Sequence, residues 1–131
     1  MMKLILDEED SLEVRAHWRS IEVGGAPLFA PSLLLYELTS NLRNKAHRGL
    51  LTDDEAASGL TFLMSLSVRT VPDLRLHPRA LQLATAFNRP NAYDAHYLAL
   101  AEELDCELWT ADGRLYNAVH ERFPLIRMLG A

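Results

Sequence analysis

The chain has 131 residues, of which 49% are hydrophobic and 24% are charged, as expected for one globular domain. Its 13 basic and 18 acidic residues give a formal net charge of −5, which excludes a basic field that attracts nucleic acid from a distance. The longest uncharged stretch, residues 23–36, contains two glycines and two prolines and is shorter than the ~20 apolar residues of a membrane helix. We therefore expect a single domain over residues 1–131 that makes no contact with a membrane.

The chain has one cysteine, Cys106, so it cannot form an internal disulfide, which fits a reducing compartment. Its first residues lead directly into an apolar run and lack the features of a signal peptide. Both observations favour a cytoplasmic protein.

Five short apolar runs predict β-strands, because each is bounded by residues that favour turns or helix starts. The runs span residues 3–6, 27–30, 68–71, 107–110 and 125–129.

Helical patterns lie between these runs. Asp10–Glu13 and Thr52–Glu55 both have the spacing of a capping box and predict helix starts, the first for a helix that ends near Val23. Ser32 is predicted to cap a helix that ends at Gly49.

Three further helices are predicted in the second half of the chain. Pro78 suits the first position of one helix, Asn91 is expected to cap a helix over Ala92–Leu104, and a short helix is expected from about Gly113 to His120. Strands that alternate with helices indicate an α/β fold with a mainly parallel sheet covered on both faces. In such folds, sites form beyond the carboxyl ends of the strands, where the strand order reverses.

Four acidic residues are expected near that edge. Asp7 follows the first strand, Asp112 follows the fourth, Glu37 lies in the second turn of the helix after the second strand, and Asp94 lies near the start of its helix. Converging carboxylates repel one another unless they share protons or bind cations. Carboxylate oxygens without His or Cys partners favour Mg²⁺ or Mn²⁺, and a pair of such ions can clamp the attacking water and the leaving oxygen of a phosphodiester.

A plainer interpretation of these acids is open. Because 18 of the 131 residues are acidic, some fall at such positions by chance. Asp94 and Asp112 also complement helix dipoles, which need no ligand. Glu37, however, lies within a leucine-rich run, where burying a carboxylate without a partner is costly.

Three segments resemble motifs of the PIN-domain family, in particular its VapC-like toxin branch. They are residues 30–38, with Glu37, residues 92–101, with Asp94, and residues 108–115, with Asp112. The resemblance implies a three-layer α/β/α domain and Mg²⁺- or Mn²⁺-dependent cleavage of RNA. It also implies a homodimer and an antitoxin protein that places a basic side chain among the carboxylates.

The segment after the first strand departs from the family pattern. The resemblance leads us to expect an Asp, then small or hydroxyl residues and a helix before an acidic loop, whereas Leu6 is followed by Asp7, Glu8, Glu9 and Asp10. Either Asp7 is the first-strand carboxylate of a shortened chain, or that carboxylate is lost and these residues form only the acidic loop. We favour the first interpretation; the second leaves a site of three acids.

Two residues near Asp112 are candidates for supporting roles. Thr110 is a candidate to orient a metal-binding carboxylate, although a β-branched residue at the end of a strand needs no such role. Arg114 is a candidate to bind a substrate phosphate, and the alternative is a solvated arginine at the start of a helix. The basic cluster Arg43, Lys45, His47 and Arg48 suits either an RNA backbone or a helix C-terminus, and we prefer the latter.

Other chemistries are disfavoured. The five histidines lack metal-ligand spacing, and neither a serine-hydrolase nor a dinucleotide motif is present. A receiver-like domain would need a lysine late in the chain, and none follows Lys45. The remaining alternative is a PIN-like domain that has lost catalysis and binds RNA or a protein.

Overall fold

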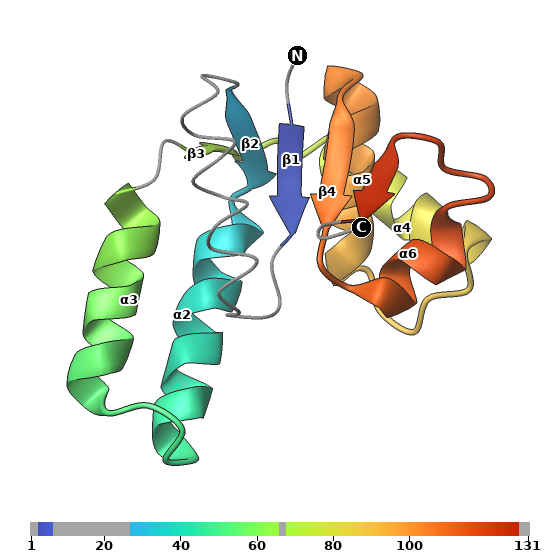
Figure 1. Cartoon of the computed structure of the whole chain (residues 1–131). Coiled ribbons are helices and arrows are strands. Elements are labelled where there is room, and N and C mark those ends of the chain that lie inside the picture. The colour runs from blue at the N-terminus through green and yellow to red at the C-terminus, as the bar shows by residue number, and fades with distance from the viewer. Residues whose placement is uncertain (1–2, 7–26, 66–67, 129–131) are drawn as a thin grey trace.

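The computed structural model describes residues 3–6, 27–65 and 68–128 (Figure 1). Five strands form one sheet, in the order β3-β2-β1-β4-β5, and each neighbouring pair is parallel. The strands are β1 (Lys3–Leu6), β2 (Leu28–Pro31), β3 (Val68–Val71), β4 (Glu107–Thr110) and β5 (Ile126–Met128). An α/β fold with a parallel sheet, as predicted, is thereby confirmed.

Five helices lie in the described part of the chain. They are α2 (Leu33–His47), α3 (Asp53–Ser65), α4 (Leu76–Ala86), α5 (Tyr93–Leu104) and α6 (Gly113–Val119). None of these described helices is long and apolar enough to cross a membrane. The helix predicted to end near Val23 lies outside the described residues.

Most element boundaries agree with the sequence-based predictions to within one residue. The capping box is confirmed at Thr52, whose hydroxyl oxygen accepts from the Glu55 N–H while the Glu55 carboxylate accepts from the Thr52 N–H, both at 3.0 Å. Ser32 occupies the N-cap position of α2, but its side chain makes no capping hydrogen bond there.

Two helix starts were predicted wrongly. Helix α4 begins at Leu76 rather than at Pro78, because a turn at Asp73 starts it earlier, with the Leu76 N–H donating to the Asp73 carbonyl over 3.1 Å. Pro78 is tolerated in the first turn, where its missing N–H would have no helical partner. The N-cap of α5 is Ala92 rather than Asn91, and it provides no side-chain acceptor.

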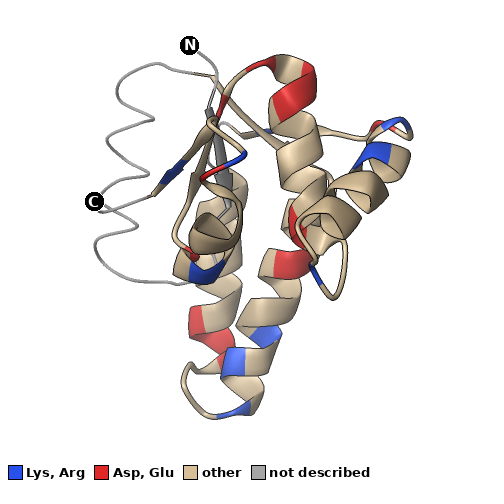
Figure 2. Ribbon diagram, turned by 90° about the vertical axis from the view of Figure 1, so that its right-hand side faces the viewer, with Lys and Arg blue, Asp and Glu red and all other residues tan. Residues whose placement is uncertain are grey.

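Helix α5 is the centre of the core. Its buried residues are Ala95, Tyr97, Leu98, Ala99, Leu100 and Ala101. It packs on β1, β2 and β4, while α4 packs on α5, so both helices lie on one side of the sheet (Figures 1 and 2). Each fully buried leucine contributes about 1.5–3 kcal/mol of transfer free energy, so this packing holds α5 firmly against the strands.

The topology places a switch point between β1 and β4. The chain runs outward from β1 to β2 and β3 and then returns to β4 on the other side of β1. Leu6, the last residue of β1, pairs with Thr110, the last residue of β4, so these strands end at the same level. A site is therefore expected beyond Leu6 and Thr110.

Candidate active site

Glu37 lies in the second turn of α2, directly after β2, and its side chain is half-buried. The hydroxyl of Tyr97, a fully buried residue of α5, donates a hydrogen bond to Glu37 Oε1 over 2.9 Å. Burial raises the pKa of Glu37 above its usual value; the Tyr97 hydrogen bond lowers it, and the charge of Asp94 raises it. The net shift is upward, so the protein holds this carboxylate in surroundings that disfavour its charge.

Asp94 lies in the first turn of α5, and 17% of its side chain is exposed. Burial is the main cause that raises its pKa, and the charge of Asp112 raises it further. Arg89 opposes this shift, with its Nη2 3.5 Å from Asp94 Oδ2. The arginine offsets the repulsion only in part, because the net shift of the pKa is upward.

Asp112 is the N-cap of α6. Its Oδ1 accepts hydrogen bonds from the backbone N–H groups of Arg114, at 2.9 Å, and Leu115, at 3.3 Å. Its own backbone N–H donates to the hydroxyl oxygen of the fully buried Thr110 over 3.0 Å. The turn after β4 is therefore fixed at both the main chain and the side chain of Asp112.

The structure brings three of the four predicted acids into one electrostatic group. The charge of Asp94 raises the pKa of Glu37, and the charge of Asp112 raises the pKa of Asp94. Asp94 is therefore the central member of the group. They come from α2, α5 and the turn after β4. We call Glu37, Asp94 and Asp112 the acidic cluster. The fourth acid, Asp7, lies outside the described residues.

The acidic cluster is suited to a hard cation that keeps water among its ligands, rather than to an ion enclosed by protein ligands alone. Among the described residues, no three His, Cys, Asp or Glu side chains are close enough to hold a metal ion by themselves. Mg²⁺ commonly takes one or two carboxylates and completes its shell with water and substrate phosphate. The donor set consists of three carboxylates, each only partly exposed, and it fits an ion of this kind.

Sequence reasoning missed two functional candidates, Arg89 and Tyr97. The position of Tyr97 three residues after Asp94, on the same helix face, was an available signal. Its partner Glu37 is 60 residues away, so only the fold pairs them. No sequence signal pointed to Arg89, which lies in the connection between α4 and α5.

The proposed supporting residues have specific places. Thr110 accepts from the backbone of Asp112 and so orients the turn. The backbone of Arg114 joins the cap, and the residue is exposed beside the acidic cluster. Figure 2 shows Lys and Arg positions gathered at the end of α2 away from the sheet, which is the location of the predicted basic cluster.

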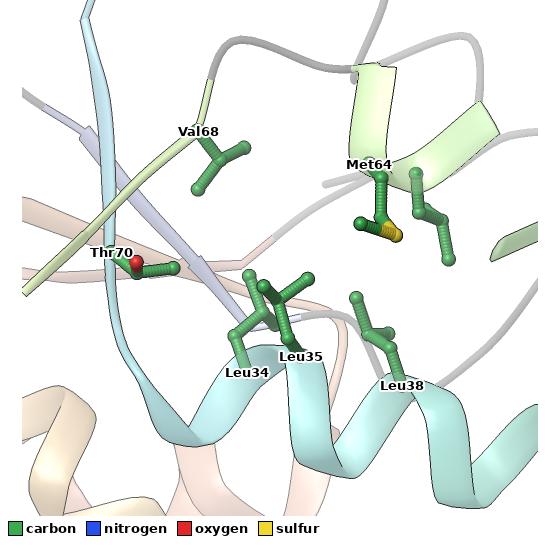
Figure 3. Close-up of a pocket in the computed structure, with 7 residues that line it drawn as sticks. Leu34, Leu35, Leu38, Met64, Val68 and Thr70 are labelled. Carbon is green, nitrogen blue, oxygen red and sulfur yellow. The ribbon is translucent and has the colours of Figure 1, made fainter. Parts of the chain in front are cut away.

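Two other features lie apart from the acidic cluster. An apolar pocket is lined by Leu34, Leu35 and Leu38 of α2, together with residues of α3 and β3, and no carboxylate lines it (Figure 3). His77 Nδ1 of α4 and His96 Nε2 of α5 lie 2.9 Å apart. Because His96 Nδ1 donates to the Ala92 carbonyl, the facing His96 Nε2 accepts from His77 when His96 is neutral.

The parallel sheet, its switch point and the acidic cluster define an α/β domain with an acidic site at the carboxyl edge of its strands. The chain matches the PIN domain family over residues 1–121, and it belongs to this family.

Curated relatives support this assignment. The chain is similar to VapC ribonuclease Mb0985 of Mycobacterium bovis and to Ribonuclease VapC9 of Mycobacterium tuberculosis, with 35% identity over 98 residues, which cover 75% of each chain. It is also 35% identical over 98 residues to Ribonuclease VapC3 of Pyrobaculum aerophilum, which covers 72% of this chain and 70% of that protein.

Proposed function

We propose that this protein is a Mg²⁺- or Mn²⁺-dependent endoribonuclease that acts as the toxin of a toxin–antitoxin pair in the cytoplasm. The electrostatic coupling of Glu37, Asp94 and Asp112 at the carboxyl edge carries the proposal. Like charges in half-buried surroundings are relieved by a bound cation. The similarity to proteins named as ribonucleases supports RNA as the substrate.

Glu37, Asp94 and Asp112, with Asp7 as a fourth ligand, would hold the ion. When bound, the ion supplies positive charge that activates a water for attack on phosphorus and stabilises the leaving oxygen. Tyr97 stabilises the ionised form of Glu37 through its hydrogen bond. Thr110 and the α6 cap hold Asp112 in place, and Arg114 provides a cation for a substrate phosphate.

Two partners are part of this proposal. An antitoxin protein would place a basic side chain among the carboxylates and so replace the charge of the metal. A homodimer is proposed from the family resemblance. Light scattering at high protein concentration tests it, and a mass corresponding only to the monomer contradicts it.

RNA cleavage tests the function. Purified protein is incubated with RNA in the presence of Mg²⁺, Mn²⁺ or a chelator, and the Asp94→Asn variant is tested alongside it. Metal-dependent cleavage by the wild type and none by Asp94→Asn is the expected result. Asp54→Asn is a matched control, because Asp54 is an exposed acid in the first turn of α3. If the wild type cleaves nothing with either metal, the alternative of a binding module without catalysis replaces the proposal.

A further inference from the structure

The backbone of Arg89 is fixed by the way α4 ends. Asn88 adopts a left-handed conformation, with φ 52°, and its N–H donates to the Thr85 carbonyl over 3.1 Å. The Arg89 N–H donates to the Ala84 carbonyl over 2.8 Å, which completes a Schellman motif. Pro90 follows, and its ring restricts the backbone further. The local sequence therefore holds Arg89 in place between α4 and α5.

The side chain of Arg89 is directed at the acidic cluster but bound loosely there. Only 22% of it is exposed, and Nη2 lies 3.5 Å from Asp94 Oδ2. A charge-assisted hydrogen bond is usually shorter, at about 2.7–2.9 Å. Arg79 of α4 makes such a pair, since its Nε and Nη2 lie 2.7 and 2.8 Å from the two carboxylate oxygens of Glu102. Arg79 is engaged in a bidentate structural pair, whereas one nitrogen of Arg89 makes a long contact.

We propose that Arg89 binds a phosphate of the RNA strand beside the acidic cluster. This inference rests on the proposed function, because it takes RNA as the ligand. The protein has a net charge of −5, and its acidic cluster repels a polyanion, so a strand that reaches the site needs a cation there. A guanidinium presents a planar fork of donors that matches two phosphate oxygens.

Salt dependence of RNA binding tests the proposal. A fluorescein-labelled single-stranded RNA is titrated with the full chain in Mg²⁺, and binding is measured by fluorescence anisotropy. Each measurement is completed before cleavage of the RNA becomes detectable on a gel. The titration is repeated at several salt concentrations. Arg89→Gln is expected to raise the Kd by roughly tenfold, the loss of one hydrogen bond to a charged group. It should also make the slope of log affinity against log salt shallower by about 0.7, the value for one phosphate contact on a single strand.

Two variants serve as controls. Arg79→Gln removes the same charge from α4, the helix that precedes Arg89, and should leave the slope at its wild-type value. Arg89→Lys retains the charge and should restore the slope. A Kd for Arg89→Gln within twofold of wild type, with an unchanged slope, overturns the proposal.

A measurement on the wild-type protein covers the case in which Arg89→Gln does not fold. Phenylglyoxal modifies arginines, and mass spectrometry locates the products. RNA should protect Arg89 and leave Arg79 reactive; equal reactivity of Arg89 with and without RNA overturns the proposal.

The two proposals fail in distinguishable ways. RNA binding that depends on Arg89 without cleavage in either metal overturns the nuclease function alone. Cleavage that Arg89→Gln leaves intact, with its Kd and slope unchanged, overturns the role of Arg89 alone. A wild-type protein that neither binds nor cleaves RNA overturns both.

Discussion

The hydroxyl of Tyr97 donates a hydrogen bond to Glu37 Oε1 across 2.9 Å and so joins α5 to α2. The contact lies at the margin of the core, since Tyr97 is fully buried and Glu37 is half-buried. It also opposes the effect of burial on the pKa of Glu37. The contact therefore links the packing of the core to the charge of the acidic cluster.

Tyr97→Phe should destabilise the protein by about 1.5–3 kcal/mol at pH 7, the usual value of a hydrogen bond to a charged group. The loss should be smaller near pH 4, where Glu37 is largely protonated and accepts a weaker bond. Urea unfolding at the two pH values measures the difference. Tyr93→Phe is the control, because Tyr93 lies on the same helix with 58% of the residue exposed. An equal loss at both pH values would show that the charge of Glu37 is not involved.

The raised pKa values of Glu37 and Asp94 predict how stability depends on pH. Desolvation favours the neutral form of each in the folded state, so their contribution to stability is full below their unfolded pKa values. It is lost as the pH rises through the raised folded values. Glu37→Gln retains an acceptor for Tyr97 and should stabilise the metal-free protein at pH 7 but not at pH 4.

Asp73 provides a control of opposite sign. Hydrogen bonds from Arg75 lower the pKa of Asp73, so its contribution is present above its unfolded pKa and lost as the pH falls through the lower folded value. Asp73→Asn should therefore reduce stability at pH 7 more than at pH 3. Thermal melts of both variants measure these effects, and a gain for Glu37→Gln that is independent of pH would contradict the first prediction.

Sequence patterns predicted the parts of the structure that depend on neighbouring residues. Thr52 and Glu55 are three residues apart, so their reciprocal caps follow from local geometry alone. The alternation of strands and helices predicted the parallel sheet, and the rule for its carboxyl edge located the acidic cluster. Glu37 was a strong candidate because its leucine-rich surroundings make an unpartnered carboxylate costly.

The remaining features depend on contacts between distant segments. Tyr97 supplies the partner of Glu37 from another helix, which no local pattern indicates. Helix α4 begins before Pro78 because Asp73 accepts hydrogen bonds from two backbone N–H groups, that of Arg75 at its side chain and that of Leu76 at its carbonyl. These bonds start the helix earlier than the usual preference of proline for the first helical position predicts. The place of Arg89 follows from the end of α4, where Asn88 adopts the left-handed conformation that glycine more usually supplies, so no sequence pattern indicated it.

Millimolar Mg²⁺ or Mn²⁺ should raise the melting temperature of the wild-type protein. Binding only to the folded state adds stability, about 2.7 kcal/mol at a free ion concentration 100 times the Kd. Asp94→Asn should gain much less, because Asp94 is the central member of the acidic cluster. Differential scanning fluorimetry compares the two with Asp54→Asn as the control. If Asp94→Asn gains as much as wild type, the ion does not bind at the acidic cluster.

The last prediction concerns Asp7, the residue after Leu6 in the sequence. Leu6 ends β1 and pairs with Thr110, the last residue of β4. If Asp7 is a ligand, Asp7→Asn should reduce RNA cleavage about as much as Asp94→Asn, because the ligands of one metal site act as a unit and their losses do not add. The double variant should then be little worse than either single variant.

Substitutions of Glu8, Glu9 and Asp10 are the matched controls for Asp7. A strand end directs one side chain at a site beyond it, so Asn or Gln at these three positions should leave cleavage close to wild type. If Asp7→Asn is silent while Asp94→Asn abolishes cleavage, the first-strand carboxylate is absent and the site depends on the acidic cluster alone. The cleavage rate of each variant, measured in Mn²⁺ over a range of RNA concentrations, separates these outcomes. The loss of a metal ligand lowers the rate at every RNA concentration. The loss of a surface charge alters only the RNA concentration needed for the half-maximal rate.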